Sequence, residues 1–142
     1  IPDVFNYQSH IKRNGMYNTP ATYPIYMAGL VFRWLLTQGG VKKIEAVNKL
    51  KAETLYRAID GSGGFYVNNI QADARSKMNV IFKTSDPDLD DTFVREAELR
   101  GLCALKGYKL LGGMRASIYN AMPLEGVEAL AAFMQDFQRR YG

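Results

Sequence analysis

Residues 24–38 set the strictest condition on the fold, because apolar side chains occur there in nearly every helical direction. A helix of this kind has no polar face, so protein must surround it. Arg33 interrupts the stretch, which is also shorter than the roughly 20 residues that cross a bilayer. We therefore expect a buried helix that ends at Gly39-Gly40, and no membrane partner. The apolar positions are Ile25, Tyr26, Met27, Leu30, Val31, Phe32, Trp34, Leu35 and Leu36.

A second helix is predicted over residues 41–59, where apolar residues recur at helical spacing. Its charged residues, Lys51 among them, lie mostly in the other directions. The glycine-rich turn at residues 60–64 ends this helix. Residues 78–82 are rich in β-forming side chains, with alternate positions on one face, and are predicted to form a strand.

Further helices and strands are predicted in the remaining sequence. One helix begins at Ser85-Asp86-Pro87, whose first two residues can cap it, and ends at Gly101. Residues 102–105 and 114–119 are strand candidates. The last helix begins near Pro123 and carries a clear apolar stripe. This alternation of helices and strands predicts the α/β class.

The predicted elements indicate two parts of different character. Residues 46–142 are expected to form a small α/β domain in which helices cover a short mixed sheet. Residues 1–45, with their all-round apolar helix, look like a segment shared with something else. The chain opens with Ile1 and not with methionine, so we expect it to be part of a longer protein.

Composition argues against several classes of function. Hydrophobic residues make up 47% of the chain and charged residues 23%, as in ordinary globular domains. The net charge of +4 comes from scattered basic residues, so we expect no nucleic-acid partner. Cys103 and His10 are the only residues of their types, which excludes an intrachain disulfide, a Cys/His zinc site and a Ser-His-Asp triad. We expect a cytoplasmic protein with a buried Cys103 and no metal.

Three places carry residues that could bind an anion, and each has a plain structural alternative. Asn18 and Thr19, ahead of the apolar helix, can hydrogen-bond an anion or only shape a turn before proline. Arg115 follows two glycines and can grip a carboxylate or remain a solvated surface arginine. Tyr108 and Lys109 belong to a loop that can concentrate positive charge or remain solvated. The residues alone leave these alternatives open.

Three stretches together resemble the phosphoserine aminotransferases of the class V aminotransferase family. They are Met16-Tyr17-Asn18-Thr19-Pro20, Ala28-Gly29-Leu30-Val31-Phe32-Arg33-Trp34-Leu35 and Gly112-Gly113-Met114-Arg115-Ala116-Ser117-Ile118-Tyr119-Asn120-Ala121-Met122-Pro123-Leu124. The last stretch is highly specific. The likeness extends over essentially all 142 residues, in order and with similar spacing.

The resemblance implies an aspartate-aminotransferase-like fold of type I, in which a large domain holds pyridoxal phosphate and a smaller C-terminal domain closes over the substrate. Residues 46–142 would be that small domain, and residues 1–45 would be the tail of the large one. The family reaction is reversible amino transfer between glutamate and 3-phosphohydroxypyruvate, giving phosphoserine and 2-oxoglutarate. It serves serine biosynthesis and, in some bacteria, pyridoxine biosynthesis. The family's Schiff-base lysine matches no residue here, so the chain alone is expected to be inactive.

The resemblance also implies roles for particular residues. Asn18 and Thr19 match an Asn-Thr pair that reaches the cofactor phosphate of the neighbouring subunit, which implies a homodimer. Arg115 matches the arginine that holds the substrate α-carboxylate. Where relatives commonly carry a His-Arg pair that binds the substrate phosphate, this chain has Tyr108-Lys109, which keeps one charge but loses the planar fork. The alternative is a stand-alone, non-catalytic α/β interaction domain derived from this fold.

Overall fold

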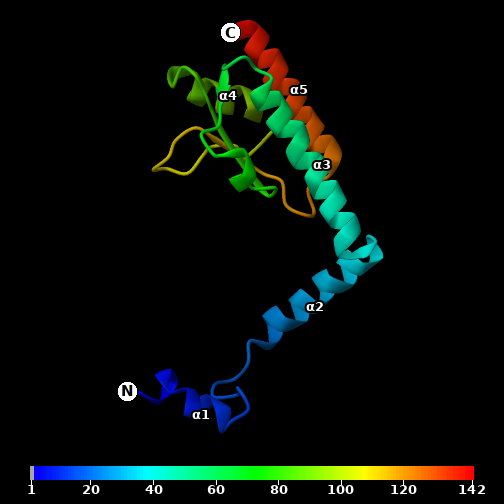
Figure 1. Ribbon diagram of the computed structural model, residues 1–142, viewed down its shortest axis with the longest axis vertical. Helices are drawn as coiled ribbons and strands as arrows, with labels where there is room; N and C mark the ends of the chain where they lie inside the picture. The colour runs from blue at the N-terminus through cyan, green and yellow to red at the C-terminus, as the bar shows by residue number, and fades with distance from the viewer. Residues whose placement is uncertain (1) are drawn as a thin grey trace. The chain divides into compact units, whose positions relative to one another are not determined.

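A computed structural model describes residues 2–142 of the chain. The chain divides into two units, one that ends at Gly40 and one that comprises Val41–Gly142. Figure 1 draws both units and labels their longer helices. The sheet and the hydrophobic core described below belong to the second unit.

The first unit contains the 3-10 helix η1 (Asp3–Phe5), α1 (Tyr7–Ile11) and α2 (Thr22–Thr37). Asn6 precedes α1, and its side chain accepts a hydrogen bond from the Gln8 N–H at 3.0 Å. His10 donates from Nε2 to the Val4 carbonyl at 2.8 Å, which ties α1 to η1. These contacts join neighbouring turns of the chain.

Helix α2 is the apolar helix that the sequence predicts over residues 24–38. Among residues 2–142 none of its residues is buried, so the burial that the sequence predicts is not provided by the described part of the chain. Tyr23, Phe32 and Leu36 are 72%, 63% and 72% exposed. The apolar pattern requires a covering surface that the described residues do not supply. Between residues 2 and 142, no helix has both the length and the apolarity needed to cross a membrane.

The second unit is built from helices and short strands that alternate along the chain, which confirms the α/β class. Asp86 Oδ1 accepts a hydrogen bond from the Asp88 N–H at 3.1 Å where the middle helix begins, and Gly101 at φ 79° lets the chain turn after it. In chain order the elements are α3 (Gly40–Asp60), β1 (Tyr66–Val67), the 3-10 helix η2 (Ala72–Ala74), β2 (Asn79–Thr84), α4 (Asp88–Leu99), β3 (Met114–Ser117) and α5 (Leu124–Tyr141).

The sheet has the strand order β1-β2-β3, and its described strands are all antiparallel. The prediction of a mixed sheet is therefore wrong. Tyr66 pairs with Thr84 across β1 and β2, and Ile81 pairs with Arg115 across β2 and β3. Strands that follow one another in the chain are neighbours in the sheet, and each pair runs in opposite directions.

Residues 102–105 do not form the predicted strand. Ala104 has a φ of 60°, outside the extended region, and Cys103 is exposed rather than buried as expected. The Arg115 N–H donates to the Leu105 carbonyl at 2.7 Å, so only the end of the stretch reaches the sheet. The apolar side chains of this segment therefore belong to a loop, of which Leu105 alone is buried.

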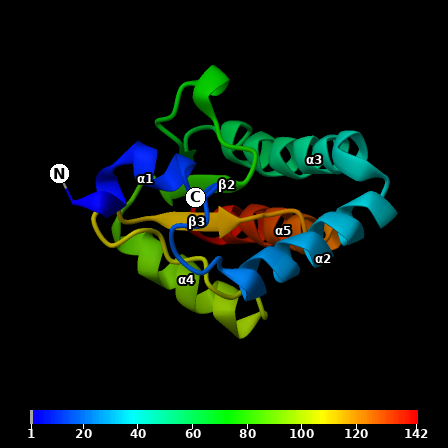
Figure 2. The same cartoon turned by 90° about the horizontal axis from the view of Figure 1, so that it is seen from below.

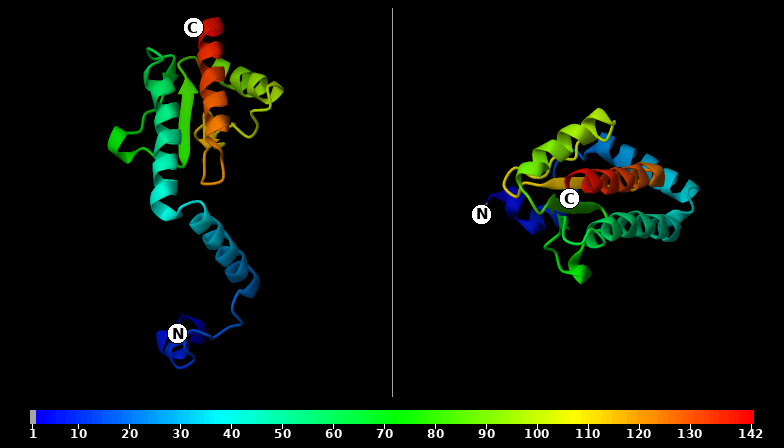
Figure 3. Two further views of the ribbon diagram at one scale, coloured as in Figure 1. Left: turned by 90° about the vertical axis from the view of Figure 1, so that its right-hand side faces the viewer. Right: turned by 90° about the horizontal axis from the view of Figure 1, so that it is seen from above.

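Helices α3, α4 and α5 pack around the strands (Figure 2), and Figure 3 shows the same three helices from two further directions. Side chains alternate along each strand, so Val80 and Phe82 of β2 and Met114 and Ala116 of β3 are buried in the core with these helices. The intervening side chains, Arg115 among them, lie on the other face of the sheet. That face is open within the second unit.

An aromatic cluster forms the centre of the core around Phe93 of α4, which is fully buried. Its ring centroid lies 4.9 Å from that of Phe133 and 5.0 Å from that of Phe137, both on α5. The rings of Phe82 and Tyr66 follow at 5.6 and 5.9 Å. All four pairs meet edge to face, the geometry that aromatic quadrupoles favour. The cluster thus joins two helices and two strands in one core.

Lys51 of α3 is fully buried, which corrects the prediction that it lies on the outer side of this helix. Its ammonium group donates to the carbonyls of Ile118, Tyr119 and Met122 at 3.0, 2.8 and 3.0 Å. Three acceptors satisfy the three N–H bonds, and this is what permits burial of the charge. Burial lowers the pKa of Lys51 from its ordinary value. The lysine fixes the turn between β3 and α5.

Candidate functional site

A cavity of about 480 Å³ lies on the open face of the sheet. Its floor comes from β2 and β3, and its walls come from the loop that follows β1 and the loop that precedes β3. The lining contains two cationic side chains, Lys83 and Arg115, and no aspartate or glutamate, which gives the cavity a positive character. The lining residues are Val67, Asn68, Asn69, Ile70, Asn79, Ile81, Phe82, Lys83, Gly107, Tyr108, Leu111, Gly112, Met114 and Arg115.

Arg115 stands in the middle of this floor. It lies in β3 directly opposite Ile81 of β2, and its neighbours Met114 and Ala116 are buried in the core, so its side chain faces the cavity. Among residues 2–142 its guanidinium forms no ion pair. A planar fork of N–H donors is therefore free to bind a carboxylate through parallel hydrogen bonds.

The loop before β3 forms one wall and is closed by glycines. The Gly107 N–H donates to the Gly113 carbonyl at 2.8 Å, and the Gly112 N–H donates to the Tyr108 carbonyl at 2.9 Å. Gly113 has a φ of 67°, and a Cβ there would lie 2.7 Å from the Phe82 carbonyl oxygen. Glycine at this position lets the loop approach β2 closely.

The two loop residues predicted to bind the substrate phosphate are placed differently. Tyr108 lines the cavity, although its side chain remains largely exposed. Lys109 is exposed and is not part of the lining. Lys106, a few residues earlier, donates to Asp91 at 3.1 Å. The structure thus brings Tyr108 and Arg115 into one cavity and leaves Lys109 outside its lining.

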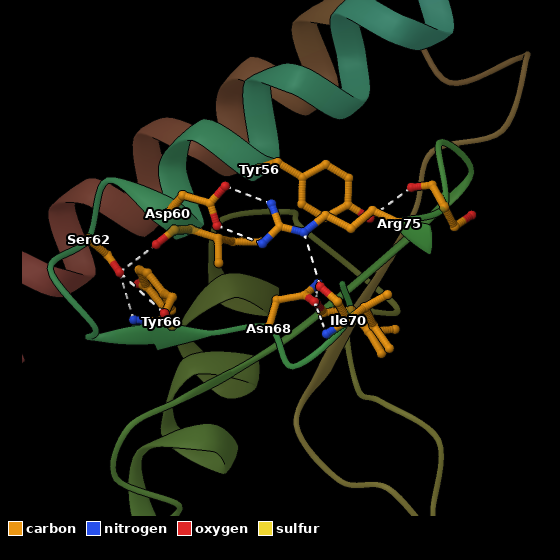
Figure 4. Close-up of polar contacts among 10 residues, drawn as sticks. Tyr56, Asp60, Ser62, Tyr66, Asn68, Ile70 and Arg75 are labelled. Carbon is orange, nitrogen blue, oxygen red and sulfur yellow. Dashed lines mark hydrogen bonds and ion pairs between the residues drawn. The ribbon is translucent and has the colours of Figure 1, made fainter. Parts of the chain in front are cut away.

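The loop after β1 forms the opposite wall and is tied down by polar contacts. Asn68 donates from Nδ2 to the Ile81 carbonyl at 2.7 Å, and its Oδ1 accepts from the Ile70 N–H at 2.8 Å. Figure 4 shows Asn68 and Ile70 side by side in this loop. These bonds join the wall to the cavity floor.

Arg75 anchors the far end of the same loop to α3 (Figure 4). Its guanidinium donates to both carboxylate oxygens of Asp60, at 2.6 and 2.8 Å, and lies 4.7 Å from the ring centroid of Tyr56. The Arg75 hydrogen bonds lower the pKa of Asp60. Sequence reasoning missed Arg75, because a single arginine in a polar loop carries no periodic or motif signal.

Lys83 was also missed, although a signal for it exists. The predicted strand ended at Phe82, whereas β2 continues to Thr84. Alternation extended by two residues would have placed Lys83 on the same face as Ile81, opposite the core. Lys83 lines the cavity together with Arg115.

Asn18 and Thr19 belong to the first unit, in the segment just before α2. Both are exposed, and in the described part of the chain neither side chain forms a hydrogen bond. Their amide and hydroxyl donors are therefore available to an anion. Across residues 2–142, no group of three or more His, Cys, Asp or Glu side chains could hold a metal ion.

Comparisons with known proteins agree with one another. Residues 2–130 match the family model described as aminotransferase class-V. The chain is 78% identical over 142 residues to a phosphoserine aminotransferase of Neisseria gonorrhoeae, covering 100% of this chain and 39% of that protein. The chain thus spans about 39% of the length of the curated relatives it matches.

Solved structures show the same likeness over most of the chain. A phosphoserine aminotransferase from Bacillus circulans subsp. alkalophilus aligns with a TM-score of 0.89 and 42% identity, covering 100% of this chain and 39% of that one. A pyridoxal-phosphate-bound phosphoserine aminotransferase from Trichomonas vaginalis aligns with a TM-score of 0.82 and 42% identity, covering 95% of this chain and 39% of that one.

Proposed function

The chain belongs to the class V aminotransferase family, and we propose that it is the C-terminal part of a phosphoserine aminotransferase. The reaction would be reversible amino transfer between L-glutamate and 3-phosphohydroxypyruvate, giving O-phospho-L-serine and 2-oxoglutarate. The observation that carries this proposal is the unpaired Arg115 on the floor of a cavity without acidic side chains. Both amino-acid substrates carry the α-carboxylate that such an arginine binds.

Different residues of the chain would bind different groups of the substrate. Arg115 would hold the α-carboxylate and so fix the orientation of the substrate Cα. Tyr108 and Lys109 would meet the phosphate of phosphoserine, Tyr108 as a neutral hydroxyl donor and Lys109 as a charge at the rim. The glycines of the same loop keep these residues close to β2.

Asn18 and Thr19 fit the phosphate of pyridoxal phosphate, because their donors are exposed and unengaged in the described chain. When bound, pyridoxal phosphate supplies the electron sink on which amino transfer depends. We propose that the two residues reach the cofactor of a neighbouring subunit, and hence that the enzyme is a homodimer. A homodimer would also offer a surface to cover the exposed apolar side chains of α2.

The wider setting follows from the same proposal. Residues 1–45 would be the tail of the large cofactor domain, and residues 46–142 would be the small domain that closes over the substrate. The enzyme would act in the cytoplasm in serine biosynthesis and, in some bacteria, in pyridoxine biosynthesis. Without the cofactor-bearing lysine, which matches no residue here, the chain alone would not transaminate.

The test uses the full-length enzyme that contains this chain, with glutamate and phosphoserine measured in separate half-reactions. Arg115→Lys keeps the charge but loses the fork, so it should lower kcat/KM for both substrates by about ten- to a hundredfold. Arg95→Lys, at an exposed position of α4, is the matched control and should change neither. A wild-type enzyme that folds but neither binds pyridoxal phosphate nor transfers an amino group would favour the non-catalytic interaction domain instead.

A further inference from the structure

The cavity on the open face of the sheet holds a second cation besides Arg115. Lys83 lines it as well, and the lining contains no acidic residue. Among residues 2–142 neither of these two side chains forms an ion pair. Their positive charges are therefore both available to an anionic ligand, which they attract together.

The position of Lys83 in β2 directs its side chain to this face. Phe82 and Thr84 on either side are buried in the core, so Lys83 projects the other way. Lys83 pairs with Val67 of β1 on one side and lies beside Gly113 on the other. A Cβ at Gly113 would lie 3.0 Å from the Lys83 Cβ, so the glycine leaves space beside the lysine stem.

The other lysines near the cavity are less well placed. Lys106 is held in an ion pair of 3.1 Å with an aspartate of α4. Lys109 is exposed and outside the lining, whereas its neighbour Tyr108 lines the cavity but brings no charge. The charge within the cavity therefore comes from Lys83 and Arg115.

We propose that Lys83 is a substrate-binding residue that contacts the phosphate of the substrate, while Arg115 holds the α-carboxylate. This inference rests on the proposed function, since it assumes an amino-acid substrate in this cavity. Ile81 is paired with Arg115, and Lys83 lies two residues further along β2, so the two cations are diagonal neighbours about 7 to 8 Å apart on the sheet. Such a pair suits a ligand with an anion at each end.

Comparing phosphoserine with glutamate tests whether Lys83 contacts the substrate phosphate. A phosphate monoester carries more negative charge than the side-chain carboxylate of glutamate and offers more acceptor oxygens to an ammonium group. Loss of the Lys83 charge should therefore harm phosphoserine more than glutamate. Lys77 provides the matched control, because it is an exposed lysine just before β2 that lies outside the lining.

The experiment measures both half-reactions by single-turnover spectroscopy in the full-length enzyme with Lys83→Gln, Lys83→Arg, Lys109→Gln and the control Lys77→Gln. Lys83→Gln should lower kcat/KM for phosphoserine about tenfold or more and for glutamate about threefold or less, since one charge-assisted hydrogen bond is lost. Lys83→Arg keeps the charge and should recover most of this loss. Lys77→Gln should change either substrate by about twofold or less, and Lys109→Gln, which removes a charge outside the lining, should lower kcat/KM for phosphoserine less than Lys83→Gln does.

Other outcomes would overturn either the role of Lys83 or the proposed function. If the wild type is active and Lys83→Gln affects neither substrate, or both equally, the role of Lys83 is overturned and the proposed function stands. A selective loss of phosphoserine in Lys109→Gln but not in Lys83→Gln assigns the phosphate to the loop tip and likewise overturns it. A folded wild type inactive with both substrates overturns the proposed function, and this inference with it.

Discussion

The guanidinium of Arg75 and the carboxylate of Asp60 meet through parallel hydrogen bonds of 2.6 and 2.8 Å. This pair connects the loop that walls the candidate cavity to the end of α3, and the ring of Tyr56 lies against the guanidinium at 4.7 Å. Arg75 also donates from Nε to the Ile70 carbonyl at 3.5 Å. The arginine therefore links a helix of the core to a residue that lines the cavity.

Removing this link should loosen the wall. In the full-length protein, Arg75→Ala should speed hydrogen exchange of the Ile70 amide and its neighbours, because the loop loses its tie to α3. Arg57→Ala, at an exposed position of the same helix, is the control and should leave these amides unchanged. Equal exchange in the two variants would show that Asn68 alone holds the wall.

The same pair predicts a pH dependence of stability. Arg75 lowers the pKa of Asp60, so the pair stabilises the fold above the ordinary carboxyl pKa of 3.8 and loses this effect as pH falls through the lower folded value. The difference in unfolding free energy between wild type and Asp60→Asn should be about 1 kcal/mol or less, since Asp60 is half exposed. It should stay constant from about pH 5 to 8 and shrink below about pH 4. Denaturant titrations at several pH values measure it, and a difference that grows in acid would contradict the assignment.

Lys51 should be a strong determinant of stability. Lys51→Met removes the donor to the Ile118, Tyr119 and Met122 carbonyls and leaves buried acceptors unpaired, so we expect a loss of about 3 kcal/mol in the free energy of unfolding. Lys49→Met, on the exposed side of α3, should cost about 0.5 kcal/mol or less. Equal midpoints of chemical denaturation for the two variants would mean that the buried lysine is dispensable.

The adjacent glycines Gly112 and Gly113 before β3 allow a test of how closely this loop must approach β2. Gly112 and Gly113 share a φ of 67°, so alanine should cost each about 1 kcal/mol for the left-handed conformation. At Gly112 a Cβ meets nothing within 4 Å, whereas at Gly113 it would lie 2.7 Å from the Phe82 carbonyl oxygen. Gly113→Ala should therefore lose about 2 kcal/mol more than Gly112→Ala in denaturant titrations. Similar losses would show that the loop can move away from β2 at little cost.

Thr19 should matter for the cofactor and not for the fold. If its hydroxyl binds the cofactor phosphate, Thr19→Ala should weaken retention of pyridoxal phosphate by about 1.5 to 3 kcal/mol while leaving the thermal midpoint of the cofactor-free protein unchanged. Thr22→Ala is the control, because the Thr22 hydroxyl already donates to the Pro20 carbonyl at 3.3 Å. Cofactor dissociation is followed by absorbance. Unchanged cofactor retention in Thr19→Ala would favour the alternative that Thr19 only shapes a turn before proline.

Local patterns were sufficient to predict most helices and two of the strands. The helical period of residues 41–59 and the apolar stripe after Pro123 are properties of the chain itself, and α3 and α5 follow them closely. The class V family was also recognisable from motifs around Asn18 and Arg115, and the comparisons confirm it. The roles of these two residues stay predictions.

Long-range contacts decided the rest, because they join residues that no local pattern relates. Residues 102–105 have a strand-like composition, but Ala104 takes a left-handed conformation and the sheet is completed elsewhere. The helical pattern predicts a surface lysine at Lys51, but carbonyls about 70 residues away in the sequence accept hydrogen bonds from its ammonium group. Lys83 enters the cavity only because β3 returns beside β2 with Gly113 next to it. A periodic pattern shows which side of a helix or strand is apolar. Tertiary packing decides which other parts of the chain each side contacts.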